Sequence, residues 1–290
     1  MMNESCCQFG PERRLAGIIT EPSERALRLG FVLVSAGLLP KCGPYRLYAQ
    51  LARRLADDGI VSLRFDLGGI GDSGQEHEGR PLKARTELEI RAALDYLSER
   101  YDLDGIVLGG LCSGAEDSFR SAASDARVTG VVLIDPFAYR TRGWAWRHVL
   151  HRLGRRALRA LGLYEPLGAE MPQARAEEKR PGLVSYKYME RAEARHILRT
   201  LVKRNAQVHF VYTAGMREVF NHPGQLRALL RDLDFEVRTI SNRGAPPSFR
   251  VGPGVVTLDY LPRIDHTQLL EEDRRRLVEV VARRLRGHAA

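Results

Sequence analysis

The stretch that most constrains the fold of this chain is residues 105–126, where an apolar strand leads into a helix with almost no loop. GIVLGGL (105–111) has the continuous apolar character of a strand buried on both faces, and GAEDSFRSAASDA (114–126) is typical of a closely packed helix. A strand that enters a helix this directly must turn sharply, and the residue at the apex takes a strained backbone conformation. Two residues could occupy the apex, Cys112 and Ser113.

The spacing of glycines favours Cys112. Close passage of strand and helix requires small residues two positions before and two positions after the apex. For Cys112 these are Gly110 and Gly114, whereas Ser113 would have a leucine at one of the two positions. We therefore expect Cys112 at the apex of a G-x-C-x-G turn, as a nucleophile whose thiolate form is favoured by the helix N-terminus. An isolated cysteine would instead be read as a small core residue.

Strand-like and helix-like segments alternate along most of the chain, which predicts an α/β fold with a mostly parallel sheet and helices on both faces. The expected strands are 15–20, 30–36, 61–67, 105–111, 128–135, 208–213 and 255–261. The expected helices are 44–59, 86–101, 114–126, 144–164, 190–204 and 267–287.

The alternation stops between residues 137 and 206, where two helical patterns flank a segment without a strand pattern. We expect a helical cap inserted over the carboxyl end of the sheet, and a flexible surface loop at 243–254 (RGAPPSFRVGPG). The predicted division is an N-terminal tail at 1–13, a core at 14–136 and 207–290, and a cap at 137–206.

Composition indicates a soluble globular protein: hydrophobic residues make up 44% of the 290 residues and charged residues 28%. No apolar run is long enough for a transmembrane segment, and MMNESCCQFGPERR lacks the apolar core of a signal peptide, so we expect a cytoplasmic protein. The four cysteines have the spacing of neither a disulfide framework nor a zinc site, and Cys6 and Cys7 are expected in the tail.

The net charge of +9 is unevenly distributed. Residues 138–164 contain no acidic residue and seven arginines, at positions 140, 142, 147, 152, 155, 156 and 159. Such a segment could face nucleic acid, an anionic membrane surface, an acidic protein or simply solvent. No helix-turn-helix, zinc-finger or RNA-binding signature is present, so nucleic acid is not an expected partner.

A cysteine nucleophile requires a base and a group that orients the base. His266 lies between the last strand and the last helix, where it can reach the carboxyl end of the sheet. Two acids could orient it, Asp135 at the end of the strand after the turn and Glu218 after a later strand; we favour Asp135. Asp265, beside the histidine, is expected to point away or to fix its loop.

The oxyanion hole is expected to consist of two backbone N–H groups. One belongs to Ser113, which directly follows the nucleophile. The other belongs to Gly37 or Leu38, in the loop SAGLLPKCGP (35–44) after the second expected strand.

The chain resembles the α/β-hydrolases over residues 14–287. The resemblance rests on SAGLLPKCGP, RFDLGGIGDSG (64–74), GGLCSGA and IDHT, in the order of that superfamily. GLCSGA followed by LIDPFAYRT is similar to a cysteine-containing bacterial subgroup found with biosynthetic and exopolysaccharide genes. The resemblance implies a Cys112–Asp135–His266 triad and a pocket floor at 64–74. One departure is Met216, which stands where the acid usually lies.

The cysteine suggests which reaction occurs, because transfer of an acyl group from a thioester to Cys112 exchanges one thioester for another. We expect hydrolysis or acyl transfer of the thioesterase or cyclase type, on an acyl or peptidyl chain held by the phosphopantetheine of a carrier protein, with the acidic carrier docked on the arginine-rich cap. The alternatives are a carboxylesterase or lactone hydrolase for free small molecules and a noncatalytic binding protein. No metal or other cofactor is expected, since the glycine motif at 69–74 is not followed by a helix.

Overall fold

The structure is a computed structural model that describes residues 2–24, 26–74, 79–161, 189–240 and 246–289. Within these ranges a ten-stranded sheet has the order β1-β2-β4-β3-β5-β6-β7-β10-β9-β8. The strands are β1 (Asn3–Phe9), β2 (Leu15–Glu21), β3 (Leu29–Val34), β4 (Val61–Phe65), β5 (Gly105–Leu111), β6 (Val128–Ile134), β7 (Gln207–Thr213), β8 (Val237–Thr239), β9 (Ser248–Val251) and β10 (Gly254–Leu261). The six strands from β4 to β10 are parallel, and the flanking strands are antiparallel.

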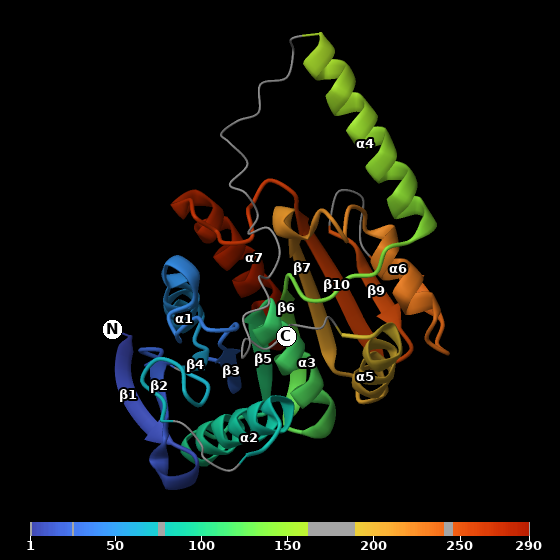
Figure 1. The fold of residues 1–290 in the computed structure, drawn as a ribbon. Helices are drawn as coiled ribbons and strands as arrows, with labels where there is room; N and C mark the ends of the chain where they lie inside the picture. Colours follow the sequence, from blue (N-terminus) through green and yellow to red (C-terminus); the bar gives the residue numbers. More distant parts are fainter. Residues whose placement is uncertain (1, 25, 75–78, 162–188, 241–245, 290) are drawn as a thin grey trace.

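Helices cover both faces of this sheet (Figure 1). The α-helices are α1 (Leu47–Asp57), α2 (Leu82–Arg100), α3 (Ser113–Ser124), α4 (Arg142–Ala160), α5 (Arg191–Lys203), α6 (Gly224–Arg231) and α7 (Glu271–Ala289). Three 3-10 turns are η1 (Pro11–Arg13), η2 (Pro44–Arg46) and η3 (Ala214–Met216). The predicted α/β fold is confirmed.

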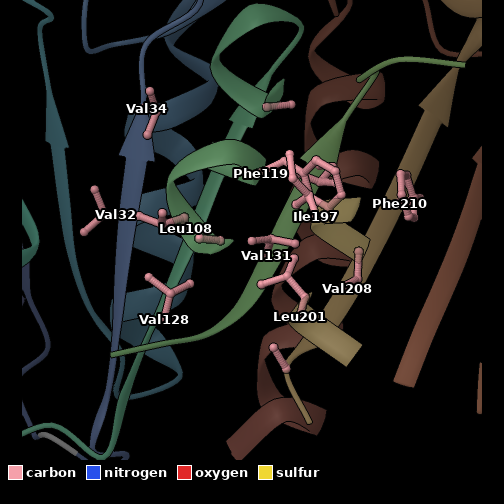
Figure 2. Close-up of a cluster of buried hydrophobic side chains, with 14 of the residues drawn as sticks. Val32, Val34, Leu108, Phe119, Val128, Val131, Ile197, Leu201, Val208 and Phe210 are labelled. Atoms are coloured by element: carbon pink, nitrogen blue, oxygen red, sulfur yellow. The ribbon is translucent and has the colours of Figure 1, made fainter. Parts of the chain in front are cut away.

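Side chains alternate between two cores along the central strands. Phe31 and Leu33 of β3 pack with α1 and α7, whereas Val32 and Val34 face the layer formed by α2, α3 and α5. Figure 2 shows this second core, in which Phe119 lies among the aliphatic side chains of the strands. Because the central strands are covered on both faces, they lack polar alternation, and for this reason they could be predicted.

Residues 3–9 form an edge strand where the sequence analysis expects a tail. β1 pairs along its whole length with β2. Its inward side chains include Cys7, which packs against the core, and Phe9, which contacts the rings of Phe65 and Tyr96. The carboxylate of Glu4 accepts hydrogen bonds from side chains of β2, α1 and β4. The sequence does not reveal this strand because its outward positions are polar and alternate with few large apolar residues.

The expected cap at 137–206 differs from the structure at its C-terminal part. Adjacent parallel strands require a crossover connection, and α5 provides it between β6 and β7. Its apolar face is buried on the sheet, so α5 belongs to the core. Of the two described helices in this region, α4 stands clear of the sheet and its covering helices (Figure 1). Residues 162–188 lie outside the described residues.

The expected loop at 243–254 also differs from the structure. Residues 248–251 form β9, which pairs with β10 and β8. Its four residues, SFRV, are too few to give a periodic pattern, although Phe249 and Val251 are buried.

Candidate active site

Cys112 occupies the apex of the turn between β5 and α3. Its backbone has φ 54° and ψ −119°, a conformation that L-residues rarely adopt and that costs about 1–3 kcal/mol. The Cys112 N–H donates to Ile134 O at 2.8 Å, so the neighbouring strand holds the turn in place. The side chain is half-buried, and Ser113 begins the helix. The structure thus places Cys112, rather than Ser113, at the apex.

The two glycines are required by close backbone contacts. A Cβ on Gly110 would lie 2.6 Å from the carbonyl carbon of Gly114. A Cβ on Gly114 would overlap the carbonyl oxygen of Val34 and lie 2.8 Å from that of Ser35. Strand and helix can therefore pass each other only without side chains at these positions, as the glycine spacing indicated.

His266 and Asp135 form a hydrogen-bonded pair. Their Nδ1 and Oδ2 atoms are 2.7 Å apart. Because a carboxylate can only accept, Nδ1 carries the proton and Nε2 remains for another group. Asp135 directly follows β6, and His266 lies in the segment between β10 and α7. Both segments leave the carboxyl end of parallel strands, and this common edge brings residues distant in sequence together.

Asp135 is held from the neighbouring strand β7. Its side chain has no solvent exposure, and its carboxylate accepts from the N–H of Thr213 at 2.6 Å and from Thr213 Oγ1 at 2.5 Å. The backbone N–H of Asp135 donates to Val211 O at 2.8 Å. With the imidazole added, the carboxylate has three donors, which fix its orientation.

The pKa of His266 is raised to about 10. The hydrogen bond to Asp135 is the largest cause, the Cys112 side chain is the second, and burial opposes both. The imidazolium form is therefore stabilised between the buried carboxylate and the sulfur. The three residues predicted as a triad form one interacting group in the structure.

The alternative acid, Glu218, lies elsewhere. Its side chain is exposed, and its backbone carbonyl accepts from Arg140 Nε at 3.0 Å. Met216 is buried within η3, and beside it Gly215 packs directly against the histidine: a Cβ on Gly215 would overlap Cβ of His266 and lie 2.9 Å from Cγ. Gly215 and Thr213 thus support the imidazole and its acid, but they become recognisable only once β7 is placed beside β6.

Asp265 fixes the loop that carries His266, which is one of the two roles expected for it from the sequence. Its carboxylate accepts from the N–H of Thr267 at 2.8 Å and of Leu269 at 3.2 Å. Gln268, buried and with φ 50°, donates its side-chain amide to the carbonyl of His266 at 2.5 Å. The backbone on both sides of the imidazole is therefore held by side chains of its own loop.

The expected oxyanion loop contacts the first residue of α3. The Gly37 N–H donates to Ser113 Oγ at 2.7 Å, so this backbone donor points at the helix N-terminus that follows Cys112. Gly37 has φ +52°, which suits glycine. The neighbouring Leu38 has an 80% exposed side chain.

Lys41 connects the expected oxyanion loop to the 64–74 loop. Its Nζ lies 2.7 Å from Oδ2 of Asp66 and 2.5 Å from Oδ2 of Asp72. Burial lowers the pKa of Lys41, but the bonds to the two carboxylates outweigh burial and raise it overall. Gly71 passes so close to Asp66 that a Cβ would overlap the carboxylate. This loop braces the expected oxyanion loop, and in the described part of the chain the next helix after its glycines is α2, which begins at Leu82.

Two cavities lie apart from Cys112, Asp135 and His266. One, of about 650 Å³, lies between β1 and α2, and the other, of about 800 Å³, lies at the amino ends of the parallel strands. Among the described residues, no group of His, Cys, Asp and Glu has a metal-binding arrangement. Over the same ranges, no helix has the length and apolar character needed to cross a membrane.

Comparisons with known proteins identify the fold. No protein-family profile and no curated protein matches the sequence. Solved structures do match: an esterase of Pyrococcus furiosus (TM-score 0.61, 11% identity, 100% of this chain and 92% of the other) and an esterase domain from Rhodothermus marinus (TM-score 0.56, 17% identity, 100% of both). A dienelactone hydrolase from Anabaena variabilis matches with a TM-score of 0.57 at 13% identity, over 97% of this chain and 96% of the other. The chain therefore has the α/β-hydrolase fold.

Proposed function

We propose that the protein is a cysteine-dependent hydrolase or acyltransferase in which Cys112 is the nucleophile, His266 the base and Asp135 the residue that orients the base. The observation that carries this proposal is the combination of Cys112 at a strained strand-to-helix turn with the 2.7 Å His266–Asp135 pair. A buried core cysteine requires neither the backbone strain nor the facing imidazole.

In the first half-reaction, Sγ of Cys112 attacks the carbonyl carbon of the acyl donor. Because the pKa of His266 is raised, Nε2 holds the thiol proton before the attack and Cys112 reacts as the thiolate, while Nδ1 of His266 remains bonded to Asp135. The N–H groups of Ser113 and of Gly37 or Leu38 stabilise the oxyanion. As the tetrahedral intermediate collapses, the bond to the leaving group breaks, His266 returns the proton to that group, and the acyl chain remains on sulfur as a thioester.

In the second half-reaction, His266 removes a proton from water, an amine or an acidic C–H, and the resulting nucleophile attacks the acyl-Cys112 carbonyl. The thiolate leaves, is reprotonated, and the enzyme is regenerated. Asp135 stabilises the imidazolium that forms in both halves, and the raised pKa of His266 is consistent with this role.

We infer that the acyl donor is a thioester, as on a phosphopantetheine carrier, because exchange between two thioesters is nearly neutral in free energy. The second candidate is a carboxylesterase or lactone hydrolase, favoured by the names of the structural neighbours, which include esterases and a dienelactone hydrolase.

Steady-state kinetics with the same acyl group attached either to a thiol or to a phenol distinguishes the thioester-specific enzyme from the esterase. We expect a higher kcat/KM with the N-acetylcysteamine thioester than with the aryl ester, and loss of both activities in Cys112→Ala. Cys6→Ala, in which an exposed cysteine of β1 is removed, is the matched control and should retain activity. Preference for the aryl ester would support the esterase, and an unchanged rate in Cys112→Ala would refute the role of Cys112.

A further inference from the structure

α4 exposes an apolar stripe along one side. Trp146, Val149, Leu150 and Leu153 follow the i, i+3, i+4, i+7 spacing of a helix face and have exposed fractions of 71%, 47%, 61% and 53%. This continuous row contrasts with the isolated exposed hydrophobic residues that every protein surface carries, and such rows mark interaction sites.

The other side of α4 is attached to the protein. Trp144 is 9% exposed and stacks on His148, and its carbonyl accepts from Asn221 Nδ2 at 3.2 Å. Arg147 Nε donates to the same asparagine at 3.1 Å. Because these contacts fix the rotation of the helix at its base, the apolar stripe is turned away from the body, and Figure 1 shows α4 standing clear of the sheet.

The charge of α4 is of one sign. The whole stretch 138–161 contains no acidic residue, and Arg152 and Arg156, one turn apart and both exposed, lie beside the stripe. An apolar face with an aromatic residue, bordered by arginines, is the pattern of a helix that lies in a lipid–water interface. At 19 residues, α4 is about 28 Å long, enough for several turns to lie along a surface.

We propose that α4 binds the protein to an anionic lipid bilayer, with Trp146, Leu150 and Leu153 inserted among the lipids and the arginines on the headgroups. The acidic carrier protein expected from the sequence would engage the arginines but leave the apolar stripe in water, so lipid accounts for more of the surface. Since α4 follows β6, the bilayer lies at the edge of the sheet that bears Asp135.

Co-sedimentation of the full chain with vesicles tests this surface. We expect binding to vesicles of phosphatidylcholine mixed with phosphatidylglycerol, and little binding to phosphatidylcholine alone. Because each arginine near an anionic surface strengthens binding about fivefold, the Arg152→Glu/Arg156→Glu variant should bind at least about 25-fold more weakly. Arg276→Glu/Arg283→Glu, with the same charge change at exposed positions on α7, is the matched control and should bind nearly as wild type does.

Fluorescence tests insertion separately. The chain has two tryptophans, and only Trp146 is exposed, so anionic vesicles should shift the emission to shorter wavelength in the wild type and not in Trp146→Phe. Leu150→Ser/Leu153→Ser should weaken binding, whereas Cys112→Ala should bind as wild type does, so that failure of the proposed chemistry and failure of lipid binding are distinguishable.

Three results would overturn the proposal. The first is the absence of binding to anionic vesicles. Binding of polyglutamate through Arg152 and Arg156 in that case would indicate that the helix recognises an acidic protein. The second is equal binding by the arginine variant and the α7 control. The third is a dimer in sedimentation equilibrium that Leu150→Ser/Leu153→Ser dissociates, which would show that a second copy covers the stripe.

Discussion

The backbone N–H of Gly37 donates a 2.7 Å hydrogen bond to the hydroxyl of Ser113, the residue that directly follows Cys112. In this structure the hydroxyl therefore occupies one of the backbone donors of the proposed oxyanion hole. A substrate carbonyl that takes this place must break the Gly37–Ser113 bond, whereas the N–H of Ser113 is part of the backbone and is independent of the side chain.

Ser113→Ala should therefore raise kcat/KM. A net hydrogen bond of about 1 kcal/mol that no longer has to be broken corresponds to about a fivefold increase. Steady-state kinetics measure it, with Ser124→Ala at the other end of α3 as the control that should change nothing. A fall in kcat/KM for Ser113→Ala would mean that the hydroxyl itself serves the reaction.

Asp135→Asn should reduce kcat by orders of magnitude while the fold is retained. The amide cannot stabilise the imidazolium, and the hydrogen bond to Asp135 is the largest cause of the raised His266 pKa, so this pKa should fall. NMR titration of the His266 ring measures the shift, and Glu218→Gln is the control. Equal losses of activity in the two variants would contradict the assignment of the acid.

The raised pKa of His266 also predicts how stability depends on pH. A group that binds its proton more tightly in the folded state stabilises the fold below its unfolded pKa of about 6.5, and this stabilisation is lost as pH rises toward the folded pKa of about 10. Urea unfolding should show the free energy of unfolding falling more steeply between these pH values in the wild type than in His266→Asn. Parallel curves would contradict the predicted coupling.

The position of His266 depends on Gly215. Gly215→Ala should displace the imidazole, because the added methyl group overlaps Cβ of His266, and misplacement of a catalytic group by about 1 Å reduces the rate about 100-fold. We expect this loss in kcat with a nearly normal circular dichroism spectrum. Gly287→Ala, where a methyl group meets nothing within 4 Å, is the control. Full activity of Gly215→Ala would show that the loop can move without consequence.

Lys41 should be important for stability, because it pairs with the buried carboxylate of Asp66. Lys41→Met leaves that carboxylate with backbone donors only, and we expect a loss of about 2 kcal/mol in urea unfolding. Lys41→Arg should retain part of the stability, since a cation still faces the buried carboxylate. A Lys41→Arg variant no more stable than Lys41→Met would contradict this explanation.

The turn at Cys112 could be predicted from sequence because the glycines that it requires lie two residues away on each side of it, although Gly114 also packs against the distant carbonyl oxygens of Val34 and Ser35. For the acid that orients His266, the sequence leaves two candidates, Asp135 and Glu218, of which Asp135 is favoured. The choice depends on the pairing of β6 with β7, which puts Thr213 beside Asp135. Gly215 was missed for the same reason, since its neighbour His266 is distant in sequence. The sequence predicts a tail and a cap where β1 and α5 lie, because a polar edge strand and a crossover helix are recognisable only when the sheet that they join is known.

The most direct test of the central claim is the intact mass of the protein after brief exposure to an activated acyl thioester. The wild type should gain the mass of one acyl group, located on the peptide containing Cys112, and Cys112→Ala should gain none. His266→Asn should acylate much more slowly. An adduct of equal yield in Cys112→Ala, or one located on another cysteine, would contradict the assignment of Cys112 as the nucleophile.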